Sequence, residues 1–475
     1  MAKNYDLIVI GAGPGGYTAA AKAAGFGQKV VVIDEDKIGG VCVNRGCIPT
    51  KALLYAAKQF SMMQHCDQFG VFTDFISFDF KKMQAYKRRS VQQYRKEIEK
   101  TFEANHIDFV RGTATIRRDK TVEVNGEDGR EYYQGKNIII ATGAKPIMPW
   151  IPGINLPGVI NSDRLLSAKN WNFERIVIIG GGVIGVEFAT IFQALCSRVT
   201  IVEKGPHLLG PMDEEVSKNL ERQLVKKGIT VHCNSTVTEI TRDDALNCQV
   251  ENHKTGEVHK LKASQVIVAI GRKPYMGKLV GEDVTLAAYS NGTLILDKNF
   301  MTSEPGIYAI GDVTGSTMLA HGAMAQATYV VEDITGRPHS VRLEAVPNGM
   351  FVSLPIVPNC IYTFPEVATV GLSEQKAEQL GLKVLCGVCT MSENGKSIIT
   401  NEEDGFIRLI FEAYTNTLVG AQMVCQRATD MIGEMATAIA NGLTAEQLLR
   451  AMRAHPTYSE GITVAIEDAL KQEVK

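Results

Sequence analysis

Two cysteines in a glycine-rich segment offer the clearest chemistry in this chain. The segment reads Gly39-Gly40-Val41-Cys42-Val43-Asn44-Arg45-Gly46-Cys47-Ile48-Pro49-Thr50-Lys51. On a regular α-helix, residues five apart are separated by about 7.5 Å along the axis, whereas a disulfide requires Cα atoms about 4.4–6.8 Å apart. Closure of Cys42 and Cys47 therefore requires an irregular backbone, which the glycines permit. A disulfide in a strained, accessible turn is easily reduced, so the segment predicts a redox-active pair.

The cysteine segment follows a dinucleotide fingerprint. Its turn is Gly11-Ala12-Gly13-Pro14-Gly15-Gly16. A buried strand is predicted over residues 6–10, a small-residue helix over 17–24 and a second strand over 29–33. Asp34 ends that strand, 21 residues after Gly13. Because such glycines let backbone N–H groups approach a pyrophosphate and such an acid accepts from a ribose hydroxyl, Gly11, Gly13, Gly16 and Asp34 are predicted dinucleotide ligands.

The same pattern recurs later in the chain. A strand over 175–179 precedes Gly180, Gly182 and Gly185, and a helix over 187–195 and a strand over 199–202 lead to Glu203. Only the first fold is followed by a cysteine pair, so we expect a resident cofactor in the first site and a diffusible one in the second. An acid at the end of the second strand favours NAD over NADP.

The elements between and after these folds contribute further candidates. A helix predicted over 81–102 has Val91, Tyr94, Ile98 and Phe102 on one face. Its basic residues are interpreted as a solvated face rather than a nucleic-acid site, because glutamates lie beside them; they are Lys87, Arg88, Arg89, Arg95 and Lys96.

Further strands are predicted to end at glycine turns that face a ligand. They lie over residues 138–142, 265–270 and 306–311, and the last is followed by Asp312, whose carboxylate could bind a polyol hydroxyl. The next helix begins within residues 318–321.

Composition limits the classes of function. A chain of 475 residues with 45% hydrophobic residues predicts about three domains with sizeable cores. A net charge of −2 gives no reason to expect nucleic acid or an anionic membrane as partner, and no apolar run reaches membrane-spanning length. The other cysteines are scattered and no signal peptide is recognised, so a cytoplasmic location is expected. Cys386 and Cys389 are interpreted as strand residues rather than half of a metal site.

One histidine near the C-terminus is a candidate base. Histidine is the side chain best suited to take a proton from a thiol near neutral pH. His455 is followed five residues later by Glu460. Such a carboxylate can orient an imidazole and raise its basicity.

Together these segments resemble the flavin-dependent pyridine nucleotide–disulfide oxidoreductases, most closely the dihydrolipoamide dehydrogenases, over essentially the whole chain. The resemblance is carried by the two fingerprints, the cysteine segment and four shorter motifs. These are Ala-Thr-Gly-Ala-Lys-Pro at 141–146, Gly-Arg-Lys-Pro at 271–274, Ala-Ile-Gly-Asp-Val at 309–313 and Tyr-Thr-Phe-Pro-Glu-Val-Ala at 362–368. The terminal His-Pro-Thr-Tyr-Ser-Glu at 455–460 completes the set.

The resemblance implies an α/β fold with two Rossmann-like dinucleotide-binding domains and a C-terminal α+β dimerisation domain. The implied bounds are 1–148 for the first part of the FAD domain, 149–276 for the NAD domain, 277–345 for the central part and 346–475 for the interface domain. FAD would occupy the first site and NAD the second. No metal is implied.

The resemblance also implies roles for individual residues. Cys42 would exchange with substrate, and Cys47 would face the flavin. Lys51 would lie near the flavin and pair with Glu187, and Asp312 would hold the ribityl chain. His455, oriented by Glu460, would act across an obligate homodimer. The remaining implied cofactor ligands are Gly112, Thr142, Gly143, Ala320, Val237 and Gly271.

The implied activity is oxidation of protein-bound dihydrolipoamide, with electrons passing through the cysteine pair and FAD to NAD⁺. The partner would be the lipoyl-carrying protein of a 2-oxoacid dehydrogenase or glycine cleavage system. The alternative is an NAD(P)H-dependent reductase of another disulfide in the same family. Glu203 disfavours a glutathione-type reductase, and the absence of cysteine from residues 467–475 disfavours mercuric reductase. Departures at Val41, Tyr275 and residues 423–430 leave the substrate open.

Overall fold

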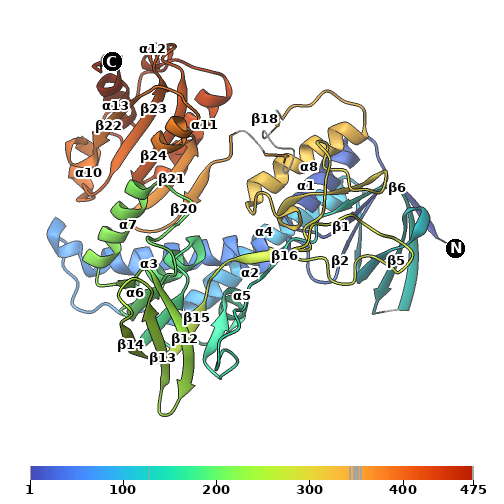
Figure 1. Cartoon of the computed structure of the whole chain (residues 1–475), viewed down its shortest axis with the longest axis horizontal. Helices are drawn as coiled ribbons and strands as arrows, with labels where there is room; N and C mark the ends of the chain where they lie inside the picture. Colours follow the sequence, from blue (N-terminus) through green and yellow to red (C-terminus); the bar gives the residue numbers. More distant parts are fainter. Residues whose placement is uncertain (1, 128, 342–343, 346–351, 354–355, 473–475) are drawn as a thin grey trace. The chain divides into compact units, whose positions relative to one another are not determined.

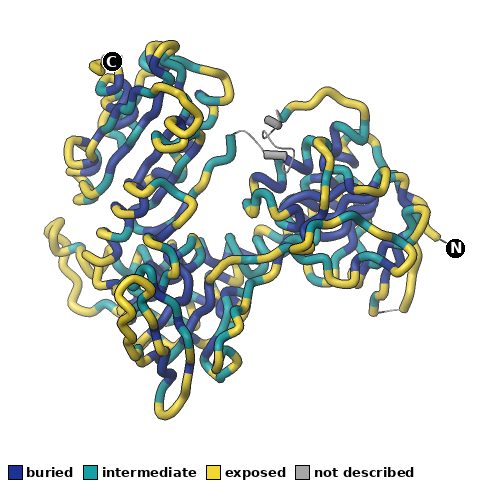
Figure 2. The backbone as a smooth tube through the Cα atoms, viewed as in Figure 1, coloured by how far each residue is buried: buried dark blue, intermediate teal, exposed yellow. Residues whose placement is uncertain are grey.

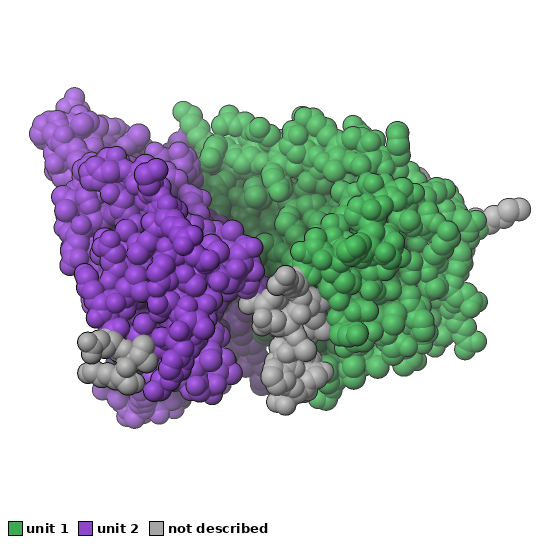
Figure 3. Space-filling model, turned by 90° about the horizontal axis from the view of Figure 1, so that it is seen from above, with its two compact units in different colours: residues 1–52, 80–147, 272–355 green, residues 53–79, 148–271, 356–475 purple. Residues whose placement is uncertain are grey.

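The computed structural model describes residues 2–127, 129–341, 344–345, 352–353 and 356–472. The chain divides into two compact units, which Figure 3 distinguishes by colour. The first comprises Met1–Ala52, Phe80–Ile147 and Arg272–Pro355. The second comprises Leu53–Asp79, Met148–Gly271 and Ile356–Lys475.

The first unit is built on a seven-stranded sheet. Its strand order is β3-β2-β1-β6-β5-β4, and β17 pairs with β6. The strands are β1 (Lys3–Ile10), β2 (Val30–Asp34), β3 (Asp108–Arg111), β4 (Thr113–Ile116), β5 (Thr121–Gly126), β6 (Gly129–Ile140) and β17 (Ile307–Ala309). The strands from β3 to β17 are parallel, whereas β5 and β4 continue from β6 as antiparallel strands.

The strands of this sheet are apolar on both faces, and helices cover one of the two. Leu7 and Val9 pack with apolar residues of α1 (Pro14–Gly25), α4 (Phe80–Ala104) and α8 (Ala320–Ile334). Ile8 and Ile10 point to the opposite face and join a second cluster with residues of β5. The alternation follows the two-residue period of a strand, and the strands form the buried centre of the unit in Figure 2.

Shorter elements complete the first unit. They are α2 (Gly40–Arg45), the start of α3 (Cys47–Gln64), η2 (Arg118–Lys120), β7 (Ala144–Pro146) paired with β16 (Arg272–Pro274), η3 (Gly311–Thr314), and β18 (Glu344–Ala345) paired with β19 (Val352–Ser353). Helix α3 extends across the boundary between the units, which falls after Ala52.

The second unit contains a parallel five-stranded sheet in the order β11-β10-β9-β15-β8. Its strands are β8 (Val159–Asn161), β9 (Arg175–Ile179), β10 (Arg198–Val202), β11 (Thr230–His232) and β15 (Gln265–Val268). The accompanying elements are α5 (Ser162–Ser167), α6 (Val183–Ala194), α7 (Glu214–Lys226) and η1 (Cys66–Phe69). A three-stranded antiparallel sheet packs with it: β12 (Ser235–Arg242), β13 (Leu246–Asn252) and β14 (Val258–Ala263).

The C-terminal part of the second unit is a five-stranded antiparallel sheet packed with helices (Figure 1). Its strands are β20 (Asn359–Ile361), β21 (Glu366–Gly371), β24 (Leu418–Cys425), β23 (Phe406–Glu412) and β22 (Val384–Thr390). Its helices are α9 (Glu374–Gln379), η4 (Met391–Glu393), α10 (Gly395–Thr400), α11 (Ala428–Ala440), α12 (Ala445–Leu449) and α13 (Glu460–Leu470). Cys386 and Cys389 lie in β22, as the alternation of their segment predicted.

The predicted fold class is confirmed: two parallel βαβ folds precede a C-terminal α+β region. The predicted domain bounds stay a prediction, and those at residues 1, 346 and 475 lie outside the described residues. Among the described residues, no helix combines the length and apolar character needed to cross a membrane.

One interpretation of the sequence was wrong in part: Arg88, Arg89 and Lys96 are exposed as expected, but two other basic residues are not. The basic residues of α4 do not all lie on a solvated face, because Lys87 is only 7% exposed and Arg95 is half-buried. Of the face predicted to be apolar, Val91, Ile98 and Phe102 are buried, whereas Tyr94 is exposed. The periodicity predicted the helix but not the positions of its charged groups. Long basic side chains can bury their aliphatic stems, so the charge can lie far from the helical position of its residue.

Candidate active site

The two cysteines lie on either side of a helix break. Helix α2 ends at Arg45, and α3 begins at Cys47. Gly46 between them has φ −138° and ψ −108°, which is not helical. The break brings the Cys42 and Cys47 side chains into hydrogen-bond contact. The irregular backbone expected from the five-residue spacing is therefore present.

The electrostatics of the pair favour a shared proton. The hydrogen bond with Cys47, followed by burial and the charge of Cys47, raises the pKa of the Cys42 thiol, whereas the charge of Lys51 lowers it. Two thiolates in contact would repel each other, which favours retention of the proton on Cys42. Both side chains are half-buried.

A pair of glycines brings the cysteine segment against the first dinucleotide turn. Gly39 and Gly40 have φ of +104° and +57°, in the region that favours glycine. A Cβ on Gly40 would lie 2.6 Å from the Cα of Gly13. The Gly39 N–H donates to the Ala12 carbonyl at 2.8 Å. Only glycine permits this approach of the two backbones.

The first dinucleotide turn has the geometry that its glycines predicted. Gly11 has φ +110°, and a Cβ on Gly16 would lie 1.8 Å from the Gly11 carbonyl oxygen. Gly13 is the N-cap of α1 and makes no side-chain capping bond. Asp34 accepts the Ala12 N–H through Oδ2 at 2.7 Å, and burial raises the pKa of its carboxyl. The uncapped N–H groups of α1 suit a pyrophosphate.

The second turn repeats this arrangement. Gly180 has φ +108°, and a Cβ on Gly185 would lie 2.0 Å from the Gly180 carbonyl oxygen. Gly182 is the N-cap of α6, without a side-chain capping bond, and a Cβ there would meet no atom within 4 Å. Glu203 accepts from the N–H groups of Gly181 at 2.5 Å and Gly205 at 2.6 Å. The space in front of this helix therefore also suits a pyrophosphate.

Four further residues predicted to bind a cofactor lie in the first unit. Gly112 N donates to the Asp34 carbonyl at 2.9 Å. Thr142 Oγ1 donates to the Tyr275 carbonyl at 2.6 Å, and Gly143 has φ +73°. Ala320 is the first residue of α8. Their roles as ligands stay predictions.

Asp312 is half-buried in η3, immediately after β17. Burial raises the pKa of the Asp312 carboxyl, and the charge of Arg272 opposes that shift. The preceding Gly311 has φ +74° and donates its N–H to Gln326 Oε1 at 2.6 Å. A carboxyl group that is partly removed from water suits a polyol hydroxyl that donates to it.

The candidate base has the partner that its sequence predicted. His455 Nδ1 lies 2.8 Å from Glu460 Oε1, and Glu460 Oε2 accepts the Thr457 N–H at 2.8 Å. The Thr457 N–H, followed by His455, lowers the pKa of the Glu460 carboxyl. The His455 side chain is 79% exposed, so the ring is oriented by Glu460 and accessible from outside.

Three other predicted residues lie in the second unit. Glu187 in α6 is 3% exposed and accepts the Tyr362 N–H at 3.2 Å. Val237 is buried in β12, and Gly271 has φ +112°. The pairing of Glu187 with Lys51 stays a prediction.

Sequence reasoning missed Asn44, which lies between the cysteines. Its Nδ2 donates to the carbonyls of Gly40, Ile38 and Lys37 at 2.9, 3.1 and 3.3 Å. Neighbouring Arg45 pairs with Asp36 at 2.5 Å. An amide between two reactive thiols could have signalled this anchoring role, because Asn readily bonds nearby backbone groups.

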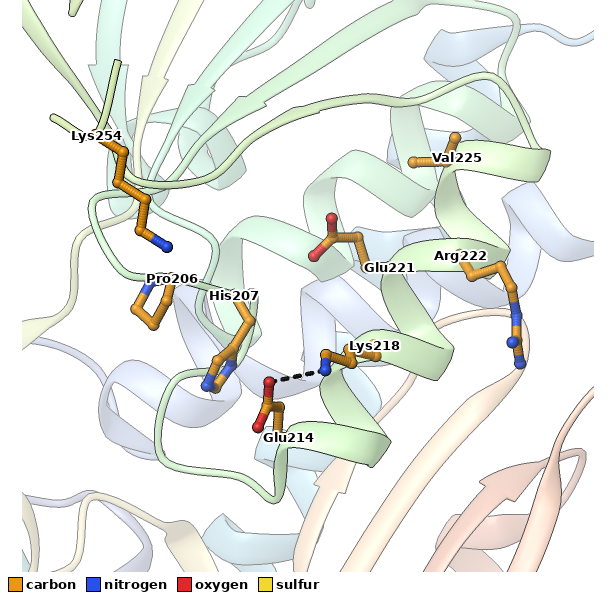
Figure 4. Close-up of a pocket in the computed structure, with 8 residues that line it drawn as sticks. All are labelled: Pro206, His207, Glu214, Lys218, Glu221, Arg222, Val225 and Lys254. Atoms are coloured by element: carbon orange, nitrogen blue, oxygen red, sulfur yellow. Dashed lines mark ion pairs between the residues drawn. The ribbon is translucent and has the colours of Figure 1, made fainter. Parts of the chain in front are cut away.

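A cavity of about 560 Å³ lies beside the second dinucleotide fold (Figure 4). It is lined by Pro206, His207, Glu214, Lys218, Glu221, Arg222, Val225 and Lys254. Glu214 and Lys218, one turn apart on α7, form an ion pair at 2.8 Å. Cations and carboxylates are mixed in its lining, and none of the predicted NAD ligands is among them. Within the described residues, no group of three or more His, Cys, Asp or Glu could hold a metal ion.

Comparison with known proteins adds to this geometry. A family described as pyridine nucleotide-disulphide oxidoreductase matches residues 5–327, and the dimerisation domain of that family matches residues 357–466. The dihydrolipoyl dehydrogenase of Chlorobaculum parvum is 37% identical over 472 residues, which cover 98% of this chain and 97% of the relative. That of Geobacillus stearothermophilus is 33% identical, covering 99% and 97%.

A solved structure gives a second kind of relative. The Cu(II) complex of the HOCl-induced flavoprotein disulfide reductase RclA from Escherichia coli matches with a TM-score of 0.84. The match has 27% sequence identity and covers 98% of this chain and 99% of that one. Similar folds therefore occur in enzymes with different names, and the residues of the site must guide the choice of substrate.

Proposed function

The chain belongs to the pyridine nucleotide-disulphide oxidoreductase family, and we propose that it oxidises dihydrolipoyl groups with NAD⁺ as electron acceptor. The single observation that carries this proposal is the contact between Cys42 and Cys47 across the break at Gly46, against a dinucleotide turn. The names of full-length relatives at 33–37% identity support the substrate. FAD and a nicotinamide dinucleotide are the cofactors of the family.

The residues of each fold suit one cofactor. FAD would lie at the turn formed by Gly11, Gly13 and Gly16, with Asp34 toward its adenosine ribose and Asp312 toward its polyol chain. NAD would lie at Gly180, Gly182 and Gly185. Glu203 would accept from a free ribose hydroxyl and repel a 2′-phosphate, which supports NAD over NADP.

The proposed chemistry begins with thiol–disulfide exchange. His455 takes the proton from one thiol of the substrate, and the resulting thiolate attacks Cys42 Sγ. The Cys42–Cys47 bond breaks, and Cys47 leaves as a thiolate. The second substrate thiol then attacks the mixed disulfide, which releases the cyclic disulfide and reduced Cys42. Bound FAD supplies the link between this two-electron thiol chemistry and hydride transfer to NAD⁺.

The base is proposed to act across a homodimer. The chain carries the dimerisation domain of the family over residues 357–466. The exposed His455 ring, held by Glu460, is available to another protomer. The lipoyl-carrying partner and a cytoplasmic location remain part of this proposal.

A second candidate is the reduction of another disulfide with NADH. The match to RclA, a disulfide reductase, favours it. Val41 and Tyr275, which depart from the usual residues of dihydrolipoamide dehydrogenases at their positions, leave the substrate open.

The deciding experiment mixes purified holoenzyme with dihydrolipoamide and NAD⁺ and measures NADH formation. In the controls, NADP⁺ replaces NAD⁺, and reduced glutathione replaces dihydrolipoamide. Rapid NADH formation only with dihydrolipoamide and NAD⁺ is expected. A flavin-containing protein that is inactive with dihydrolipoamide but oxidises NADH with another disulfide would overturn the first proposal in favour of the second.

A further inference from the structure

Two neighbouring side chains of α4 contact the surroundings of the cysteine pair. Arg95 Nη2 donates a hydrogen bond to Asn44 Oδ1. The Tyr94 and Tyr17 hydroxyls are hydrogen-bonded, and Tyr17 interacts electrostatically with both Cys42 and Cys47. All of these residues belong to the first unit. These contacts join α4 to the segment that carries Cys42 and Cys47.

The bond from Arg95 completes the hydrogen bonding of Asn44. The Nδ2 group of Asn44 already donates to carbonyls of residues 37, 38 and 40. An amide whose nitrogen and oxygen are both engaged has one favourable orientation. Arg95 therefore fixes the amide that ties the 37–40 loop to the turn carrying the thiols.

The guanidinium of Arg95 is also partly removed from water. The residue is half-buried, and its Nε is buried without a hydrogen-bond partner among the described residues. A charge in such surroundings is screened less than one on the surface, so it acts more strongly on neighbouring groups. Through its bond to Asn44 this cation is held against the segment that carries the two thiols. A cation held there favours the reduced pair, because that form can carry a thiolate.

We propose that Arg95, acting through Asn44, is a positioning residue that sets the redox equilibrium of the Cys42–Cys47 pair. This inference rests on the proposed redox function of that pair. The equilibrium is the exchange of one protein disulfide and two glutathione thiols for one protein dithiol and one glutathione disulfide, a transfer of two electrons. Loss of the Arg95 charge shifts it toward the protein disulfide.

The variants separate charge from structure. Arg95→Met removes the charge and the donors, Arg95→Gln keeps an amide donor without charge, and Arg95→Lys keeps the charge without the planar fork. Arg88→Met is the matched control, because Arg88 is an exposed residue of the same helix. It removes the same charge from the chain.

The experiment equilibrates each holoenzyme with glutathione buffers of known ratio at several pH values. The pair is then trapped by alkylation, and the peptide that contains both cysteines is quantified by mass spectrometry. In Arg95→Met we expect about a tenfold shift toward the disulfide, which corresponds to about 30 mV for a two-electron couple. Arg95→Gln should shift similarly, Arg95→Lys less, and Arg88→Met not at all.

The outcomes also separate this inference from the proposed function. If the wild-type pair titrates between disulfide and dithiol but folded Arg95→Met and Arg95→Gln titrate within twofold of it, the role of Arg95 is refuted and the redox function stands. If the wild-type pair never forms the disulfide, both fail. A shift of equal size in Arg88→Met would mean that net charge, not position, sets the equilibrium, and would also overturn the inference.

Discussion

The two dinucleotide folds of this chain have matching turns. Gly11 and Gly180 have φ of +110° and +108°, and the N-caps Gly13 and Gly182 have ψ of −174° and −177°. In each turn, a carboxylate at the end of the second strand accepts a backbone N–H, at 2.7 Å in the first and 2.5 Å in the second. Two turns of different sequence thus adopt the same backbone conformation.

The folds differ in the segment that comes after the second strand. In both folds a residue of this segment donates its backbone N–H to a carbonyl of the glycine turn: Gly39 donates to Ala12 at 2.8 Å, and Leu209 donates to Gly181 at 3.0 Å. After β2, the two positive-φ glycines then lead into the cysteine segment. After β10, the Leu208 side chain fills the space beside Gly181, where an added Cβ would lie 2.5 Å from Leu208 Cδ2. The turn suits a dinucleotide in both folds, and only in the first fold does the next segment carry a pair of thiols.

The largest expected effect is the loss of turnover when Cys47 of the first fold is replaced, in contrast to replacement of Cys233 in the second. Cys47→Ser should lower turnover of dihydrolipoamide by about 10³-fold or more, because the disulfide can no longer form. Cys233→Ser, in the second fold, should leave turnover within about twofold, since burial, followed by Glu221, raises the pKa of Cys233 to about 12. Steady-state NADH formation measures both. Equal losses in the two variants would end the functional distinction between the folds.

The same glycine substitution should have different consequences in each fold. In Gly16→Ala and Gly185→Ala the new methyl group would lie within 2.0 Å of a carbonyl oxygen, so each helix must move from its strand. Each change should cost about 3 kcal/mol or more of unfolding free energy. Gly16→Ala should purify without flavin, whereas Gly185→Ala should keep its flavin and lose affinity for NAD⁺. Flavin absorbance and NAD⁺ titration test this, and the reverse pattern would exchange the two cofactors.

Glu203 should control the choice between NAD and NADP. Glu203→Gln keeps an acceptor for the Gly181 N–H but removes the charge that repels a 2′-phosphate. The preference for NAD⁺ over NADP⁺, measured as the ratio of kcat/KM values, should fall about tenfold. Asp34→Asn is the control, because it changes the other fold. An unchanged ratio in Glu203→Gln would remove the basis for assigning NAD to the second fold.

The smallest effect is a pH dependence at Asp34. Burial raises the pKa of this carboxyl in the folded protein, so folding favours its protonated form. Its contribution to stability is present below the usual carboxyl pKa of about 3.9 and is lost as pH rises through the raised folded value. The stability advantage of flavin-free wild type over Asp34→Asn should therefore shrink from pH 4 upward. Urea unfolding at successive pH values measures it, and an advantage that grows with pH would contradict the burial of this charge.

The parts that sequence reasoning located are those in which neighbouring residues determine the backbone. Each glycine fingerprint requires a positive φ at its first position and close helix–strand packing at its last, whatever surrounds it. The five-residue spacing of the cysteines required a break that Gly46 supplies. His455 and Glu460 are close in the chain, and the short turn between them brings their side chains together.

Long-range contacts were beyond that reasoning. The helix α4 was predicted, but Arg95 bonds Asn44, 51 residues earlier in the chain. Lys22 of α1 pairs with Glu332 of α8 at 2.8 Å, and β17 joins the sheet beside β6. Several rotamers of a long side chain are compatible with one helical position, and only packing against distant segments selects among them.

The sequence by itself determined the two dinucleotide turns, the acids that close them and the broken helix that carries the thiols, because φ, helix period and chain spacing are local properties. Only the tertiary structure decided that Arg95 of α4 bonds Asn44 of the cysteine segment instead of facing the solvent. It also decided that Asp34 and Asp312 are partly removed from water and therefore have raised pKa values. Burial and partner choice depend on segments that are far apart in the chain and become neighbours only on folding.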